Sequence, residues 1–176
     1  EKVSDKVIQW KKSKDKKKIF VNLSPTKPIV KTKKIRKGDN CTIVFCEASK
    51  YIMKFKADLD LDQSIHSFHE LTQLIKKLNP DIKEKVKFRT KGNFSFESEK
   101  KFTKIFGKKH IDKISVSNTF EKAIFNSKLV IIAYPQTTFC ESIYSNTPTI
   151  LILRENHWKL SEEAQNVFNE LKKNKI

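Results

Sequence analysis

The chain has 176 residues, of which 38% are hydrophobic and 10% aromatic, so it can bury one core and is not a disordered polymer. Its formal net charge is +17, but only Arg36, Arg89 and Arg154 are arginine and the lysines are spread over nearly every segment. This pattern is typical of a solvated surface and argues against a dedicated nucleic-acid site. No apolar run is long enough for a membrane-spanning helix.

The cysteines indicate a reducing compartment. Cys41, Cys46 and Cys140 form no C-x-x-C pair, and two of them stand in apolar runs where cysteine acts as a small buried hydrophobe. We therefore predict a cytoplasmic protein, with peripheral contact to the anionic inner membrane as one use of its positive charge. Because the sequence begins at Glu1 and not at Met, we also expect a further domain to precede it.

Residues 1–40 are predicted to form a basic lead-in and linker. The lysine run at 11–18 is typical of a helix end or a solvated connector. A short strand is expected at 19–23, because the prolines that follow it exclude a helix. Gly38-Asp39-Asn40 indicates a turn, after which the ordered core is expected to begin.

From Cys41 onward, apolar runs alternate with amphipathic stretches, which predicts an α/β domain over 41–176 with a parallel sheet of about five strands and helices on both faces. The last two runs are continuously apolar, as expected of central strands. The strands are expected at 42–46, 86–89, 114–116, 129–134 and 149–153. The helices are expected at 65–78, 102–106, 119–125, 137–145 and 161–173.

A polar turn follows the fourth predicted strand. Pro135 ends this strand, and Thr137 and Thr138 open a helix whose hydroxyls and amides are suited to binding phosphate. Glu141 has two interpretations. With Thr138 it fits a capping box, and as a carboxylate one turn into the helix it can accept hydrogen bonds from ribose hydroxyls. Spacing alone favours the cap.

The segment 127–150, SKLVIIAYPQTTFCESIYSNTPTI, resembles the donor-site signature of glycosyltransferases with the GT-B fold. It has the apolar strand, the hydroxyl-rich turn, the helix with an early Glu and the Pro that leads into the next strand. The continuation over 154–176 resembles a family of transferases found with bacterial surface-polysaccharide genes, those for LPS, O-antigen or capsule. The resemblance implies a Rossmann-like, C-terminal donor-binding half of such an enzyme.

The resemblance also implies roles for particular residues. Glu141 is expected to bind the ribose of a nucleotide-sugar donor, and Thr137 and Thr138 its diphosphate, with Gln136 of the same turn assigned to the donor site. The donor is a substrate, and no cofactor is expected.

The loop that carries Ser117 and Asn118 follows the third predicted strand. In the GT-B pattern the corresponding loop approaches the base of the nucleotide, so both residues are candidates for donor binding. Capping of the helix that follows explains the loop equally well.

Arg89 closes the second predicted strand, and a flexible Lys91-Gly92 follows it. A guanidinium at the carboxyl end of a strand suits phosphate or carboxylate recognition, while a surface cation is an equally good explanation in so basic a chain. Related enzymes often continue this strand with His-Pro, whereas this chain has Thr90 and Lys91.

Weaker candidates follow the first predicted strand. Glu47, Ser49 and Tyr51 are placed where an acceptor would enter, although a single Glu after a strand is more often simply solvated. No metal site is expected, because His66 and His69 lack a third ligand nearby in the sequence.

Three functions are compatible with the sequence. The first is a glycosyltransferase donor domain that passes a sugar from a nucleotide to a glycan or glycolipid acceptor. The sequence identifies no catalytic residue, and the base is expected in an N-terminal GT-B domain outside this chain. The second is a nucleotide-sugar epimerase of the same fold. The third is a basic nucleic-acid-binding domain, which is disfavoured because the phenylalanines have core spacing.

Overall fold

The computed structural model divides the chain into two units, Glu1–Lys31 and Thr32–Ile176, which we describe separately. In the first unit, strand β1 (Val7–Gln9) pairs in parallel with β2 (Phe20–Asn22). The strand expected at 19–23 is therefore present as β2, while β1 was not predicted. The residues that the structure describes are 7–9, 20–22, 38–47, 61–90, 97–135, 137–154, 158 and 160–174.

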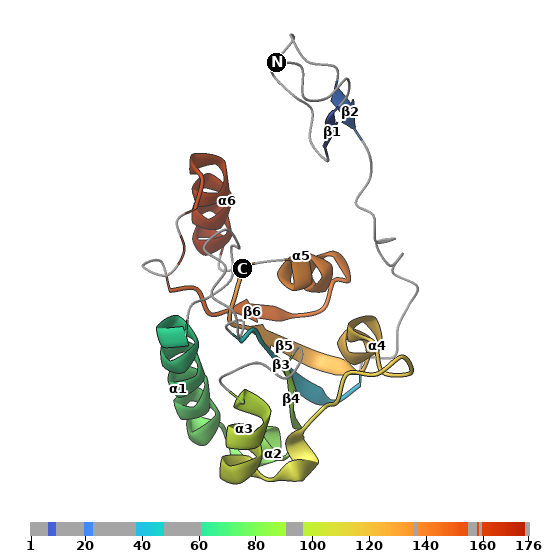
Figure 1. Cartoon of the computed structure of the whole chain (residues 1–176), viewed down its shortest axis with the longest axis vertical. Coiled ribbons are helices and arrows are strands. Elements are labelled where there is room, and N and C mark those ends of the chain that lie inside the picture. The colour runs from blue at the N-terminus through green and yellow to red at the C-terminus, as the bar shows by residue number, and fades with distance from the viewer. Residues whose placement is uncertain are drawn as a thin grey trace. The chain divides into compact units, whose positions relative to one another are not determined.

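The second unit contains a four-stranded parallel sheet in the order β4-β3-β5-β6 (Figure 1). Val44 of β3 pairs with Arg89 of β4 on one side and with Ile132 of β5 on the other. The predicted α/β class with a parallel sheet is confirmed, but the run at 149–153 forms an edge strand, β6, and not a central one. The strands are β3 (Asn40–Phe45), β4 (Val86–Thr90), β5 (Ser127–Ile132) and β6 (Thr149–Leu151).

The sheet has four strands and not five, because residues 114–116 do not form the expected strand. Ile111 makes a single parallel bridge to Phe88 at the edge of the sheet, and the chain then turns away. Ile114 and Val116 are 51% and 99% exposed. Without a layer to cover these side chains, the alternating apolar pattern has nothing to stabilise it as a strand.

Helices are present at all five expected places, and a short helix, α2, was not predicted. Asn79-Pro80 ends α1 as expected, but Pro80 also begins α2, since a proline is well tolerated in the first turn. Thr119 and Ser161 cap the helices that follow them, with side chains that accept from Lys122 N and Ala164 N. The helices are α1 (Leu61–Lys77), α2 (Pro80–Glu84), α3 (Ser98–Phe106), the 3-10 helix η1 (Lys108–His110), α4 (Phe120–Phe125), α5 (Thr137–Tyr144) and α6 (Glu162–Lys173).

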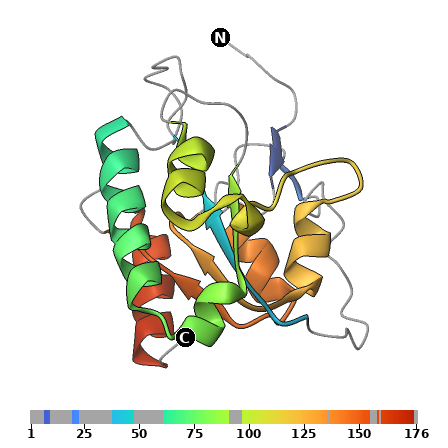
Figure 2. The ribbon, with the colours of Figure 1, turned by 90° about the horizontal axis from the view of Figure 1, so that it is seen from below.

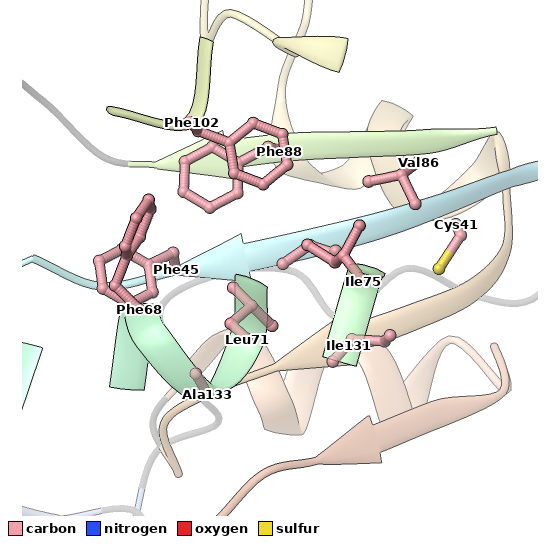
Figure 3. Packing of buried hydrophobic residues seen from close by; sticks show 11 residues of the cluster. Cys41, Phe45, Phe68, Leu71, Ile75, Val86, Phe88, Phe102, Ile131 and Ala133 are labelled. Carbon is pink, nitrogen blue, oxygen red and sulfur yellow. The ribbon is translucent and has the colours of Figure 1, made fainter. Parts of the chain in front are cut away.

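The sheet separates two hydrophobic clusters, and Figure 2 shows helices on both sides of the sheet. Alternate residues of β3 point to opposite faces, so Phe45 packs with α1 and α3 while Val44 packs with α4, α5 and α6. In the first cluster, Phe88 stacks on Phe102 with ring centroids 4.1 Å apart (Figure 3). Phe68 meets Phe45 edge to face at 5.7 Å. Of the phenylalanines at core spacing, Phe68 and Phe102 are thus buried, whereas Phe106, Phe120 and Phe168 are only partly buried.

Gly38 lies against the turn that precedes β5, where its amide donates to Phe125 O. A Cβ at position 38 would stand 2.1 Å from the carbonyl oxygen of Asn126. We expect Gly38→Ala to lower the free energy of unfolding by about 1–3 kcal/mol, because backbone must move to relieve the overlap. Urea denaturation measures the loss. Asp39→Ala, at an exposed neighbour, is the control, and equal stability of the two variants would contradict the expectation.

The cysteines differ in exposure. Cys41 is 4% exposed, and burial raises the pKa of its thiol to about 11, whereas Cys140 is exposed. Because the thiolate is the nucleophile, we expect iodoacetamide at about pH 8 to modify Cys140 and to leave Cys41 intact until the chain is unfolded. The raised pKa also means that stability falls as the pH rises through 9 toward 11. Mass spectrometry of labelled peptides checks the first expectation, and equal labelling of both cysteines would refute it.

Candidate functional site

The topology of the sheet singles out the carboxyl ends of β3 and β5. From β3 the chain passes through α1 to β4 on one side, and from β5 it passes through α5 to β6 on the other. The two neighbouring strands therefore lead away in opposite directions. In open parallel sheets, ligands bind at such a switch point, beyond the carboxyl ends of the strands.

Helix α5 begins almost directly after β5. Tyr134 is buried there, and its Oη lies 3.0 Å from Thr138 Oγ1. Burial raises the pKa of the Tyr134 phenol to about 12. The hydrogen bond with Thr138 lowers this pKa, but its effect is smaller than that of burial. Because α5 starts at Thr137, Thr138 is inside the helix and is not the N-cap that the capping-box interpretation requires.

Glu141 lies one turn into α5 and is half-buried. Its charge, with that of Cys46 at the end of β3, contributes to the raised pKa of Tyr134, so these three side chains are close enough to interact. Thr137 is exposed at the start of the helix. Gln136 lies outside the described residues. The structure therefore brings Glu141 and Thr138 together with Tyr134 at the switch point.

Glu47, at the end of β3, is 3% exposed, so it is not the solvated side chain that its isolated position suggested. Its Oε1 accepts a hydrogen bond from the backbone amide of Ser98 at 2.9 Å and another from the Ser98 hydroxyl. Thr90 Oγ1, at the end of β4, is 3.5 Å from the same oxygen. Ser49 and Tyr51, the other candidates after this strand, lie outside the described residues.

Arg89 is not a surface cation, since it is only 2% exposed. Its Nη1 donates to Asp112 Oδ2 at 2.8 Å, and its Nη2 donates to the carbonyl oxygen of Asn118 at 2.5 Å. The guanidinium therefore joins the end of β4 to the loop that follows the Ile111 bridge. The contacts with Asp112 and Asn118 therefore explain why Arg89 is buried.

The loop with Ser117 and Asn118 is held by several hydrogen bonds. Asn118 Nδ2 donates to Asp112 Oδ1 at 2.5 Å and to Lys113 O at 2.9 Å, and Asn118 N donates to Ser115 O at 3.1 Å. Ser117 Oγ is 3.1 Å from Ser115 Oγ. Thr119 then caps α4, as the capping interpretation predicted. The loop is thus ordered by its own contacts and by Arg89.

Sequence reasoning missed three residues of these groups. The apolar pattern marks Tyr134 only as the last residue of a strand, although a tyrosine just before Pro135 is a polar group at a carboxyl end. Ser98 and Asp112 carry no signal of their own, because their partners, Glu47 and Arg89, are far away in the sequence.

Two negative findings apply to the part of the chain that the structure describes. Within it, no three His, Cys, Asp or Glu side chains are grouped so that they could hold a metal ion. Within the same residues, no helix is both long and apolar enough to cross a membrane.

The fold and the site define a parallel α/β protein with hydroxyl and carboxylate side chains at a switch point. The sequence matches the family model of the LIC12162 family transferases over residues 1–176. The chain therefore belongs to this transferase family. Searches of curated proteins and of solved structures found no match.

Proposed function

We propose that the unit 32–176 binds a nucleotide-activated sugar and presents it for transfer to a glycan or glycolipid of a surface polysaccharide. The observation that carries the proposal is the start of α5 directly after β5, with Thr137 and Thr138 in its first turn and Glu141 one turn further. Membership of a transferase family and the resemblance of 127–150 to GT-B donor sites support it.

The residues after β5 have complementary tasks in this proposal. The amides at the start of α5 favour the negative charge of a diphosphate. Tyr134 is neutral at physiological pH, and either hydroxyl of the Tyr134–Thr138 pair can be the donor; when Tyr134 donates, the Thr138 hydroxyl hydrogen is left for a phosphate oxygen. Glu141 accepts hydrogen bonds from the ribose. Together these contacts stabilise the charge of the departing nucleotide.

The acceptor requires groups beyond those described. We propose that an N-terminal domain supplies the base that deprotonates the acceptor hydroxyl, as in enzymes of the GT-B type. The excess of lysine suits peripheral contact with an anionic membrane that carries a glycolipid acceptor.

Calorimetry with UDP, GDP, CDP, CMP and their sugars tests the donor site. We expect one nucleotide to bind. Glu141→Ala should lower the affinity for this nucleotide by about tenfold or more, because it removes charge-assisted hydrogen bonds to the ribose. Glu162→Ala is the matched control, because Glu162 is an exposed carboxylate early in another helix, α6. Absence of binding by the unsubstituted protein would refute the proposal, as would equal effects of the two variants.

The reaction products separate transfer from epimerisation. A transferase releases nucleotide when an acceptor is added, whereas an epimerase changes the sugar of the donor without any acceptor. Nucleic-acid binding would instead depend steeply on salt and be indifferent to Glu141→Ala. The burial of Phe45, Phe68, Phe88 and Phe102 argues against base stacking as a source of such affinity.

A further inference from the structure

A buried carboxylate lies at the switch point and is not used by the donor contacts proposed above. Glu47 is carried two residues past the end of β3, the strand next to β5, and is 3% exposed. Because Cys46 and Glu47 are consecutive, they point to opposite faces, Cys46 toward Tyr134 and Glu47 toward α3.

One oxygen of Glu47 has a structural explanation. Glu97, the N-cap residue of α3, has φ 52° and makes no side-chain cap. The first amide of α3, Ser98 N, donates instead to Glu47 Oε1, as does the Ser98 hydroxyl. Thr90 Oγ1 approaches the same oxygen. Glu47 Oε1 thus caps α3 from a distant strand.

The other oxygen has no such explanation. Glu47 Oε2 is buried and has no hydrogen-bond partner among the residues that the structure describes. A buried carboxylate oxygen without a donor is costly, so native proteins rarely retain one. The carboxylate cannot turn to satisfy Oε2 without releasing the amide of α3. Oε2 is therefore a fixed hydrogen-bond acceptor, and the residues that the structure describes supply no donor for it.

We propose that Glu47 Oε2 accepts a hydrogen bond from a hydroxyl of the sugar carried by the nucleotide donor. This inference rests on the proposed donor site at α5. Val44 of β3 lies opposite Ile132 of β5, so the segments that follow the two strands emerge side by side, with a spacing of about 4.8 Å between the strands. In this proposal a diphosphate at the start of α5 leaves the sugar as the next group of the donor, and the sugar extends across the carboxyl end of β3 toward Glu47.

The chemistry of the site selects a hydroxyl. A carboxylate only accepts, so the ligand must donate. Oε1 is fixed by Ser98 and Thr90, which places Oε2 in a defined direction. A site built to bind one hydroxyl rejects an analogue that lacks it, because its acceptor is then left buried and unpaired. Glu47 is thereby a specificity-determining residue for the sugar.

Calorimetry with matched pairs tests this role: UDP and UDP-glucose, GDP and GDP-mannose, CMP and CMP-N-acetylneuraminate. We expect the unsubstituted protein to bind one nucleotide-sugar more tightly than its bare nucleotide. Glu47→Gln retains an oxygen for Ser98 but offers an amide NH2 at the position of Oε2. The ratio of its affinity for the nucleotide-sugar to its affinity for the bare nucleotide should fall by about tenfold or more. Its affinity for the bare nucleotide should stay within about twofold of that of the unsubstituted protein.

Glu97→Gln is the matched control, because it makes the same change at an exposed residue next to Ser98. The Glu97 side chain pairs with Lys100 and makes no side-chain cap of α3. This variant should preserve the preference for the nucleotide-sugar. If Glu47→Gln also preserves that preference, or if the unsubstituted protein binds nucleotide and nucleotide-sugar equally, the inference is overturned while the donor site at α5 stands. If no nucleotide binds, the proposed function fails and this inference fails with it.

A second measurement avoids dependence on the folding of the variant. Deoxy and fluoro analogues of the bound sugar remove one hydroxyl donor at a time from the ligand. Binding to the unsubstituted protein should fall by about tenfold or more for one ring position. Equal affinity for all analogues would overturn the inference.

Discussion

Replacement of Arg89 by methionine is expected to lower the free energy of unfolding by about 3–5 kcal/mol, because it leaves the Asp112 carboxylate and the Asn118 carbonyl without their buried partner. Urea denaturation followed by circular dichroism measures the loss. The same variant should loosen the loop at 112–118, which hydrogen exchange at the amide of Asn118 reports.

Arg154→Met provides the matched control for Arg89→Met. Arg154 also binds a carboxylate through two nitrogens, that of Glu70, but this pair is exposed. Exposed ion pairs contribute about 0–1 kcal/mol, so the control should be nearly as stable as the unsubstituted chain. If both variants lose the same stability, Arg89 is not the structural link between β4 and the loop.

Phe88→Ala is expected to cost about 3–5 kcal/mol of stability, since it opens a cavity at the centre of the first hydrophobic cluster. Phe88 is fully buried, stacks on Phe102 and lies 6.0 Å from the ring of Phe45. Figure 3 shows these rings between β3, β4 and α1. Thermal and urea unfolding measure the effect.

Phe106→Ala is the control for this cavity. The ring centroids of Phe106 and Phe102 are 4.6 Å apart, but Phe106 is only partly buried, at the border of the cluster. Surrounding side chains and water can therefore fill the space that the substitution leaves. We expect a smaller loss than for Phe88→Ala. A loss as large at position 106 would show that the centre of the core lies elsewhere.

Much of the fold follows from local patterns in the sequence. The apolar run that became β5 needs only its own residues to be recognised as a buried strand, and apolar spacing at three and four predicts α1 in the same way. Residues 114–116 have a strand-like pattern but remain a loop, because a strand also needs a neighbouring layer, and local sequence does not report whether that layer exists.

The candidate site was predictable only in part. Thr137, Thr138 and Glu141 could be named because they are contiguous with a strand that the sequence predicts well. The burial of Glu47 depends on α3, and that of Arg89 depends on Asp112 and Asn118. These contacts join segments that are distant in the sequence. The local sequence around a single Glu or Arg after a strand therefore does not predict them.

The alternation of side chains just beyond β3 has a consequence for the proposed donor preference. Cys46 and Glu47 are adjacent in sequence, yet they serve different layers, one toward Tyr134 and α5 and the other toward Thr90 and α3. If the proposed roles hold, nucleotide preference and sugar preference form two modules that can be exchanged independently.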